Sequence, residues 1–135
     1  MTSDKTTIVK AFLAAAVEAD WEKLQQYRHP DFQVTESEAL PYAGVYKGVD
    51  GFRKLVKLIF IELFDDFKVE PECFAEGDNH VLLLANISGV GKNTGIGFSS
   101  QVAEIYHLDN QLIKEIQPFY WDTQLITRAF CGGGY

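Results

Sequence analysis

Three carboxylates lie among apolar residues, where a carboxyl group can take part in proton transfer. Glu104 sits in Val102–Leu108, in which every second residue is otherwise apolar. Glu36 ends the alternating stretch DFQVTE, and Asp122 follows an aromatic run. An apolar pocket raises the pKa of a carboxyl group, which can then take a proton from a carbon beside a carbonyl. A second, neutral carboxyl group can hydrogen-bond to the enolate. Glu36, Glu104 and Asp122 are therefore the candidate acid–base groups.

Each carboxylate also has a structural interpretation. Glu36 is followed by Ser37 and Glu38, and a solvated acidic run is the usual state of such residues. Glu104 can face inward without reacting with a ligand. Asp122 precedes TQLI, where aspartate commonly caps a helical turn. The sequence leaves both interpretations open for all three residues.

Aromatic side chains are the expected contacts of an apolar ligand, although aromatic residues also fill cores by default. The candidates are Phe12, Tyr42, Phe60, Tyr106, Phe119 and Trp121. No histidine, cysteine or acidic residues have the spacing of metal ligands, and we expect neither a metal nor another cofactor.

The elements that must position these residues follow from hydrophobic periodicity. The spacing of apolar residues predicts a helix at 4–18, a short helix at 21–28 and a long helix at 50–63. Residues 39–48 are expected to form a loop. Alternating or apolar runs predict strands at 31–37, 67–75, 80–90, 96–108 and 112–122. Pro71 confines its segment to a sheet edge or a strand end, and residues 80–90 are apolar enough for both faces to be covered.

Helices that precede a run of antiparallel strands predict an α+β domain over residues 1–135, with the helices on one face of a curved sheet. The last two strands form a hairpin around Asp109-Asn110-Gln111. Its loop could hold two, three or four residues, and a slip of one residue turns every side chain of the last strand to the other face. The sequence therefore does not place Asp122 and Glu104 on the same face.

Composition excludes several classes of protein. The 135 residues suffice for one core, and a net charge of −7 disfavours binding to nucleic acid or anionic membranes. No apolar run approaches the length of a membrane span, and the N-terminus lacks the order of a signal peptide. We expect a cytoplasmic protein.

The hairpin VAEIYHLDNQLIKEIQPFYWDT and the segment PYAGVYKGVDGFRKLV resemble the NTF2-like superfamily, in particular its ketosteroid isomerase and SnoaL-like polyketide cyclase branches. The resemblance extends from Ile8 to about Arg128 and concerns the fold more than the reaction. It implies an α+β cone, a small apolar ligand in an internal pocket and a homodimer formed through the sheet. Residues Gln101, Ala103, Ile105 and His107, opposite Glu104, would form the dimer face.

The resemblance also implies roles for individual residues. Glu36 stands where ketosteroid isomerases have their general base, and Glu104 stands where they have a protonated acid. Phe12 takes the place of their tyrosine and has no hydroxyl to donate, which argues against steroid isomerisation. Asp122 is the candidate for the acid–base aspartate of SnoaL-like cyclases. Val102 stands where limonene epoxide hydrolases have an arginine, so that chemistry is not supported.

Two functions are consistent with these residues. The first is an isomerase or cyclase-like enzyme that uses carboxylates on an apolar carbonyl compound. The second is a non-catalytic module that binds a ligand or dimerises. Two facing carboxylates in the pocket would favour the enzyme, and an all-apolar cavity would favour binding alone.

Overall fold

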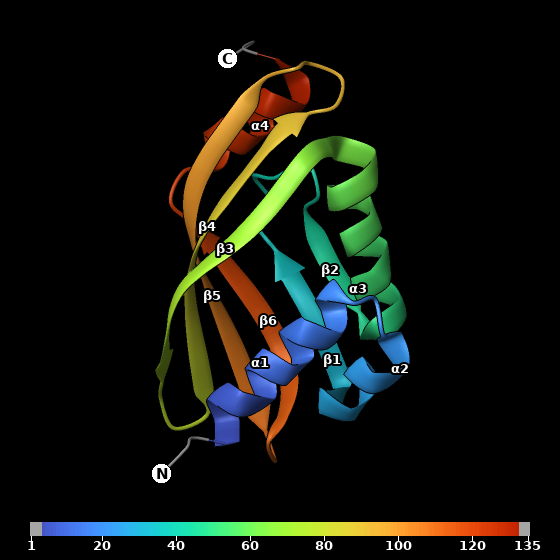
Figure 1. The fold of residues 1–135 in the computed structure, drawn as a ribbon, viewed down its shortest axis with the longest axis vertical. Coiled ribbons are helices and arrows are strands. Elements are labelled where there is room, and N and C mark those ends of the chain that lie inside the picture. The colour runs from blue at the N-terminus through green and yellow to red at the C-terminus, as the bar shows by residue number, and fades with distance from the viewer. Residues whose placement is uncertain (1–3, 133–135) are drawn as a thin grey trace.

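The apolar runs form a six-stranded sheet in the order β2-β1-β6-β5-β4-β3 (Figure 1). The computed structural model describes residues 4–132. Its helical elements are α1 (Asp4–Val17), α2 (Trp21–Leu24), η1 (Gln25–Tyr27), α3 (Gly48–Lys57), the π-helical η2 (Leu58–Leu63) and α4 (Thr123–Cys131). Its strands are β1 (Arg28–Glu36), β2 (Gly44–Lys47), β3 (Phe64–Glu76), β4 (His80–Gly91), β5 (Gly97–Asp109) and β6 (Leu112–Tyr120).

Strands β3 to β6 form the predicted antiparallel meander, and β3, which contains Pro71, lies at the edge. Strand β1 pairs with β6 in parallel and with β2 in antiparallel orientation. Because β1 and β6 run the same way, their carboxyl ends meet, and α4 begins there. This edge of the sheet brings Glu36 close to the end of β6.

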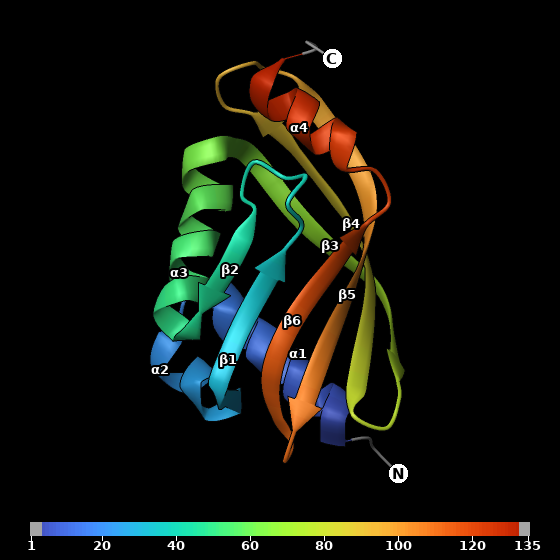
Figure 2. The ribbon, with the colours of Figure 1, turned by 180° about the vertical axis from the view of Figure 1, so that it is seen from behind.

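Helices α1 and α3 cover one face of the sheet. Helix α1 crosses in front of the strands in Figure 1 and behind them in the reverse view of Figure 2. Helix α3 packs over β1 and β2, and α1 contacts β3 and β4. This arrangement confirms the predicted α+β fold, with the helices before the meander and on its inner face.

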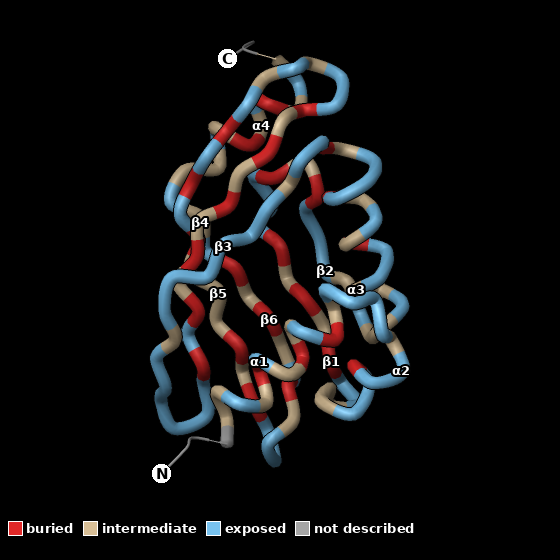
Figure 3. The backbone as a smooth tube through the Cα atoms, in the orientation of Figure 1, coloured by how far each residue is buried: buried red, intermediate tan, exposed pale blue. Residues whose placement is uncertain are grey.

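Buried side chains form a continuous core between the helices and this inner face (Figure 3). Phe12 of α1 is fully buried, and its ring lies 5.7 Å from that of Phe32 and 5.4 Å from that of Phe52. In β4, Val81 and Leu83 are buried, whereas Leu82 is 38% exposed. The prediction that both faces of residues 80–90 are covered is therefore wrong at Leu82, whose side chain remains exposed in a single chain.

Two predicted elements differ in extent. Residues 44–47 form the short edge strand β2 rather than loop, because β1 offers a free edge with which they pair. The long helix begins at Gly48, and its last turn is π-helical from Leu58 to Leu63. The turn expected after residue 122 is the nine-residue helix α4.

The hairpin between β5 and β6 closes with a two-residue loop. Asn110 and Gln111 have φ angles of 52° and 62°, which is the conformation of a type I′ turn. Asp109 pairs with Leu112, but the register shifts by one residue after Leu108, so that His107 pairs with Glu115. Because of this β-bulge, the residues of β6 that follow it point to the opposite face from the one they would have in an unbroken register.

No helix in residues 4–132 is long and apolar enough to cross a membrane.

Candidate functional site

Glu36 is the last residue of β1 and points to the inner face, where it is only 6% exposed. The Tyr120 hydroxyl donates a hydrogen bond of 2.9 Å to its Oε1. Burial raises the pKa of Glu36 from 4.5 to about 8, the hydrogen bond from Tyr120 opposes this rise, and the charge of Glu104 adds to it. The solvated interpretation of Glu36 is therefore wrong.

Two further tyrosines support Tyr120. Tyr42, in the loop before β2, is 1% exposed, and its hydroxyl donates to the Tyr120 hydroxyl at 3.2 Å. The Tyr46 hydroxyl donates to the backbone carbonyl oxygen of Tyr42 at 2.9 Å. Burial, together with the charge of Glu36, raises the pKa values of Tyr42 and Tyr120 well above their ordinary range, so both remain hydrogen-bond donors at physiological pH.

Glu104 lies on the inner face of β5 and is partly buried, as the alternation predicts. The hydroxyl of Tyr106, two residues later on the same face, donates to its Oε1 at 2.8 Å. Burial raises the pKa of Glu104, and this hydrogen bond lowers it. Strand β6, whose Pro118 pairs with Glu104, lies between β5 and β1, so Glu104 and Glu36 flank the same end of β6, and the charge of Glu104 raises the pKa of Glu36. We call Glu36, Glu104, Tyr42, Tyr106 and Tyr120 the carboxyl–tyrosine cluster.

A cleft of about 270 Å³ opens beside Glu36, where β1 and β6 end and α4 begins. It is lined by Thr35, Glu36, Ser37, Gln117, Pro118, Phe119, Tyr120 and Thr123. Glu36 and Tyr120 thus join the cluster to the cleft. Phe119 lines the cleft, and its side chain is half exposed on the outer side of β6.

The remaining predicted contacts are not gathered around this cleft. Tyr42 and Tyr106 are buried in the cluster, and Phe12 lies in the core against Phe32 and Phe52. Phe60 is 46% exposed on η2 and packs against the Phe67 ring at 5.0 Å. Trp121 is 86% exposed. Phe60 and Trp121 therefore lie on the surface.

Asp122 is the N-cap residue of α4. Its Oδ1 accepts a hydrogen bond of 2.9 Å from the Gln124 backbone N–H, which confirms the capping interpretation. It is not among the residues that line the cleft. The structure thus brings Glu36 and Glu104 into one cluster and gives Asp122 a structural role at the start of α4.

Replacing Asp122 with alanine is expected to lower the free energy of unfolding by about 1 kcal/mol, because the first turn of α4 loses its cap. Asp122→Asn is the matched control, since asparagine also caps helices. Urea denaturation of both variants measures the difference. Equal stability of the alanine and asparagine variants would contradict this role.

Tyr120 and Tyr46 are site residues that the sequence did not point to. With a two-residue loop and no bulge, Tyr120 would pair with Gln101 and face outward. The bulge makes it pair with Val102 instead, on the inner face. The polar turn at Asn110 predicts the hairpin, but no pattern in the sequence predicts the bulge.

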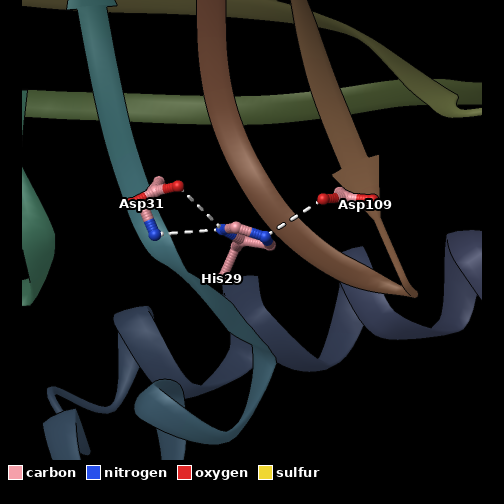
Figure 4. Close-up of polar contacts among 3 residues, drawn as sticks. All are labelled: His29, Asp31 and Asp109. Carbon is pink, nitrogen blue, oxygen red and sulfur yellow. Dashed lines mark hydrogen bonds and ion pairs between the residues drawn. The ribbon is translucent and has the colours of Figure 1, made fainter.

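A second polar group lies at the opposite end of β1 (Figure 4). His29 Nδ1 accepts a hydrogen bond from the Asp31 backbone N–H at 3.0 Å, so Nε2 carries the ring proton of the neutral form. Nε2 lies 3.1 Å from Asp109 Oδ2. His29 thereby ties the start of β1 to the turn of the β5–β6 hairpin. Within residues 4–132, no three histidine, cysteine or acidic side chains are grouped to hold a metal ion.

Comparisons with known proteins agree with this architecture. An NTF2-like protein from Burkholderia thailandensis matches with 25% identity and a TM-score of 0.82, over 96% of this chain and 98% of that one. TerC, crystallised with polyporic acid, matches with 14% identity and a TM-score of 0.80, over 95% and 98% of the two chains. A protein from Jannaschia sp. CCS1, described as a candidate SnoaL-like polyketide cyclase, matches with 14% identity and a TM-score of 0.77, over 99% and 98%.

The comparison with curated proteins gave no match. The family model of the SnoaL-like domain matches residues 9–116, which include most of α1, strands β1 and β5, and both glutamates of the cluster. The chain therefore belongs to the SnoaL-like domain family and has its NTF2-like fold.

Proposed function

We propose that this protein is an acid–base enzyme that binds a small apolar carbonyl compound in the cleft and moves a proton on it. The observation that carries the proposal is the pair of inward-facing carboxyl groups, Glu36 and Glu104, each hydrogen-bonded through one oxygen by a tyrosine. An all-apolar cavity would have favoured binding alone.

Glu36 is the proposed base, because it lines the cleft and its pKa of about 8 lies near physiological pH. Its carboxylate takes a proton from the carbon beside the ligand carbonyl, and the electron pair moves to the carbonyl oxygen. Returning that proton to a different carbon isomerises the ligand. Attack of the enolate carbon on a second carbonyl of the same molecule would close a ring.

Glu104 is the proposed neutral acid. Repulsion between two nearby carboxylates disfavours double ionisation, so one group keeps its proton while the other acts as the base. Burial raises the pKa of Glu104, and its protonated form can donate a hydrogen bond to the enolate oxygen of a ligand that extends from the cleft toward the carboxyl–tyrosine cluster. In this arrangement the tyrosine hydroxyls come from the sheet and the β1–β2 loop, whereas Phe12 on helix α1 has none to offer.

The comparisons support an oxygenated apolar compound as the ligand class. TerC was crystallised with polyporic acid, and the Jannaschia protein is described as a candidate polyketide cyclase. The apolar lining of the cleft by Pro118 and Phe119, with polar groups from Thr35 and Ser37 beside them, suits a ring that carries a few oxygens.

Exchange of carbon-bound hydrogen for deuterium tests the proposal without knowledge of the natural substrate. A panel of cyclic ketones and 1,3-dicarbonyl compounds is incubated with the protein in D₂O, and NMR follows loss of the proton beside the carbonyl. Exchange above the buffer rate for at least one compound supports the enzyme. Compounds that bind without any acceleration of exchange would instead support a ligand-binding module.

We also propose a homodimer that forms through the outer face of the sheet. Apolar residues on three neighbouring strands support this dimer. Leu84 of β4 pairs with Ala103 of β5, which pairs with Phe119 of β6. Leu82 and Phe119 are 38% and 51% exposed, and contiguous exposed apolar residues commonly mark an interface. The same face includes Ile105, opposite Leu82.

Replacing Ile105 with glutamate is expected to convert the dimer to monomer at micromolar concentration, because the new charge would be buried without a partner. Sedimentation velocity measures this change. Gln26→Glu adds the same charge at an exposed residue of η1 and should leave the dimer intact. A wild-type protein that sediments only as monomer would refute the proposal.

A further inference from the structure

The hydroxyl groups of Tyr42 and Tyr120 form a hydrogen-bond chain that ends on Glu36. Each tyrosine hydroxyl has one proton to donate. Tyr120 directs its proton to Glu36 Oε1 at 2.9 Å, and its oxygen accepts the proton of Tyr42 at 3.2 Å. This direction is favoured when Glu36 is ionised, because hydrogen bonds to a charged acceptor are stronger than those to a neutral hydroxyl.

Tyr42, at the far end of this hydrogen-bond chain, is fixed by its packing. Tyr42 is almost fully buried, and its ring packs edge-on against Phe64 and Tyr120, with centroids 6.4 Å away in both cases. The Tyr46 hydroxyl binds the Tyr42 backbone carbonyl at 2.9 Å. Packing of this kind restricts the rotamers of Tyr42, so its hydroxyl is pre-organised toward Tyr120.

The second oxygen of Glu36 has a different environment. No described residue donates a hydrogen bond to Oε2, in contrast to Oε1. Oε2 is also not sealed in the core, because within residues 4–132 Arg28 Nε is the single side-chain polar atom that is both fully buried and without a partner. Glu36 lines the cleft, so Oε2 is the oxygen that a ligand in the cleft can reach.

We propose, resting on the acid–base function above, that Tyr42 and Tyr120 are positioning residues that hold Oε1 of Glu36 and leave Oε2 to exchange the proton with the ligand. Oε2 takes the proton from carbon, the electron pair goes to the ligand carbonyl, and Oε1 keeps its hydrogen bond throughout. The same Oε2–H then returns the proton. Tyr42 acts on Glu36 only through Tyr120 and does not touch the ligand.

The test compares Tyr120→Phe and Tyr42→Phe with Tyr27→Phe. Phenylalanine keeps the ring and removes only the hydroxyl, and Tyr27 lies just before the start of β1, whereas Glu36 is at its other end. The protein is labelled with ¹³C at the glutamate carboxyl carbons, and NMR follows their titration, with Glu36→Gln identifying the Glu36 signal. The rate of hydrogen exchange on the most reactive ketone is measured over the same pH range.

Tyr120→Phe is expected to raise the pKa of Glu36, because the hydrogen bond from Tyr120 lowers it in the wild type. At pH 7 the exchange rate should fall about tenfold, the size expected for one hydrogen bond to a charged group. Tyr42→Phe should shift the titration in the same direction but less, with about a threefold loss of rate. Tyr27→Phe should change neither quantity.

The two proposals fail separately. If the wild type accelerates no exchange but Tyr120→Phe and Tyr42→Phe shift the Glu36 titration, the enzyme proposal fails and the positioning chain stands. If Glu36 titrates in both variants as it does in Tyr27→Phe, the proposed hydrogen-bond chain is refuted, whether or not the protein is active. Should Tyr120→Phe not fold, Tyr42→Phe alone decides the test, and a titration unchanged from wild type would refute the chain.

Discussion

Replacing Glu36 with glutamine is expected to lower the rate of ligand hydrogen exchange by about 10²- to 10⁴-fold, the usual contribution of a general base. Glutamine has nearly the same shape as glutamate, and its side-chain carbonyl oxygen can accept the hydrogen bond from Tyr120. It has no basic oxygen that can take a proton from carbon. The loss should therefore appear in the exchange rate and not in the fold.

Glu38→Gln is the matched control, because Glu38 lies two residues away and is exposed. Glu104→Gln should also slow exchange, but it should do so through weaker stabilisation of the enolate, since its amide can still donate a hydrogen bond. NMR in D₂O measures all three variants on one ketone. A Glu36→Gln variant that keeps the rate of Glu38→Gln would exclude Glu36 as the base.

The second large effect concerns stability as a function of pH. The pKa of Glu36 is about 8 in the folded protein and 4.5 as a model carboxyl group, so the folded state holds the proton more tightly than the unfolded state. Between these pH values, folding binds a proton, and the free energy of unfolding must fall as pH rises. For one such group the fall between pH 5.5 and 8.5 is about 3 kcal/mol.

Glu36→Gln should remove this fall, because glutamine does not titrate. At pH 8.5 the variant is therefore expected to be more stable than the wild type, since no charge has to be buried. Glu104, whose pKa is also raised, leaves a slope of the same sign. Urea denaturation at pH 5.5 and 8.5 measures the change. Parallel pH dependence in wild type and Glu36→Gln would show that Glu36 is not held in the buried environment described above.

The choice of pH range separates this effect from two others. Thr6 hydrogen bonds lower the pKa of Glu76, and hydrogen bonds from Thr35 and Gln33 lower that of Glu115. Groups of this kind contribute stability that is lost as pH falls, which is the opposite sign. Their effect lies in the acid range, so measurements above pH 5 report chiefly on Glu36 and Glu104.

If both results are obtained, Glu36 lowers the stability of the folded protein and acts as the base in proton transfer. A variant that becomes more stable at alkaline pH and loses exchange activity fits a group retained for function rather than for folding. A purely structural Glu36 would lose stability on replacement by glutamine or leave it unchanged at pH 8.5. The pair of measurements therefore separates the enzyme from the structural alternative.

The sequence by itself determined the order of the three N-terminal helical segments and of five of the six strands, and the row of residues that contains Glu104. Both follow from local periodicity, in which side chains alternate along a strand and recur at three and four residues in a helix. The resemblance of the hairpin and of the segment before α3 to the NTF2-like superfamily agreed with that order. The order of the elements and the face on which Glu104 lies do not depend on the register of the other strands.

The tertiary structure alone decided which groups surround the two glutamates. The bulge in β6 turns Tyr120 inward and Phe119 outward, and no period-two pattern can show where one extra residue is inserted. The acidic run at Glu36 reads as solvated, yet the parallel pairing of β1 with β6 and the loop that carries Tyr42 cover it. Burial depends on what packs above a residue, and that information lies in contacts between segments far apart in the chain.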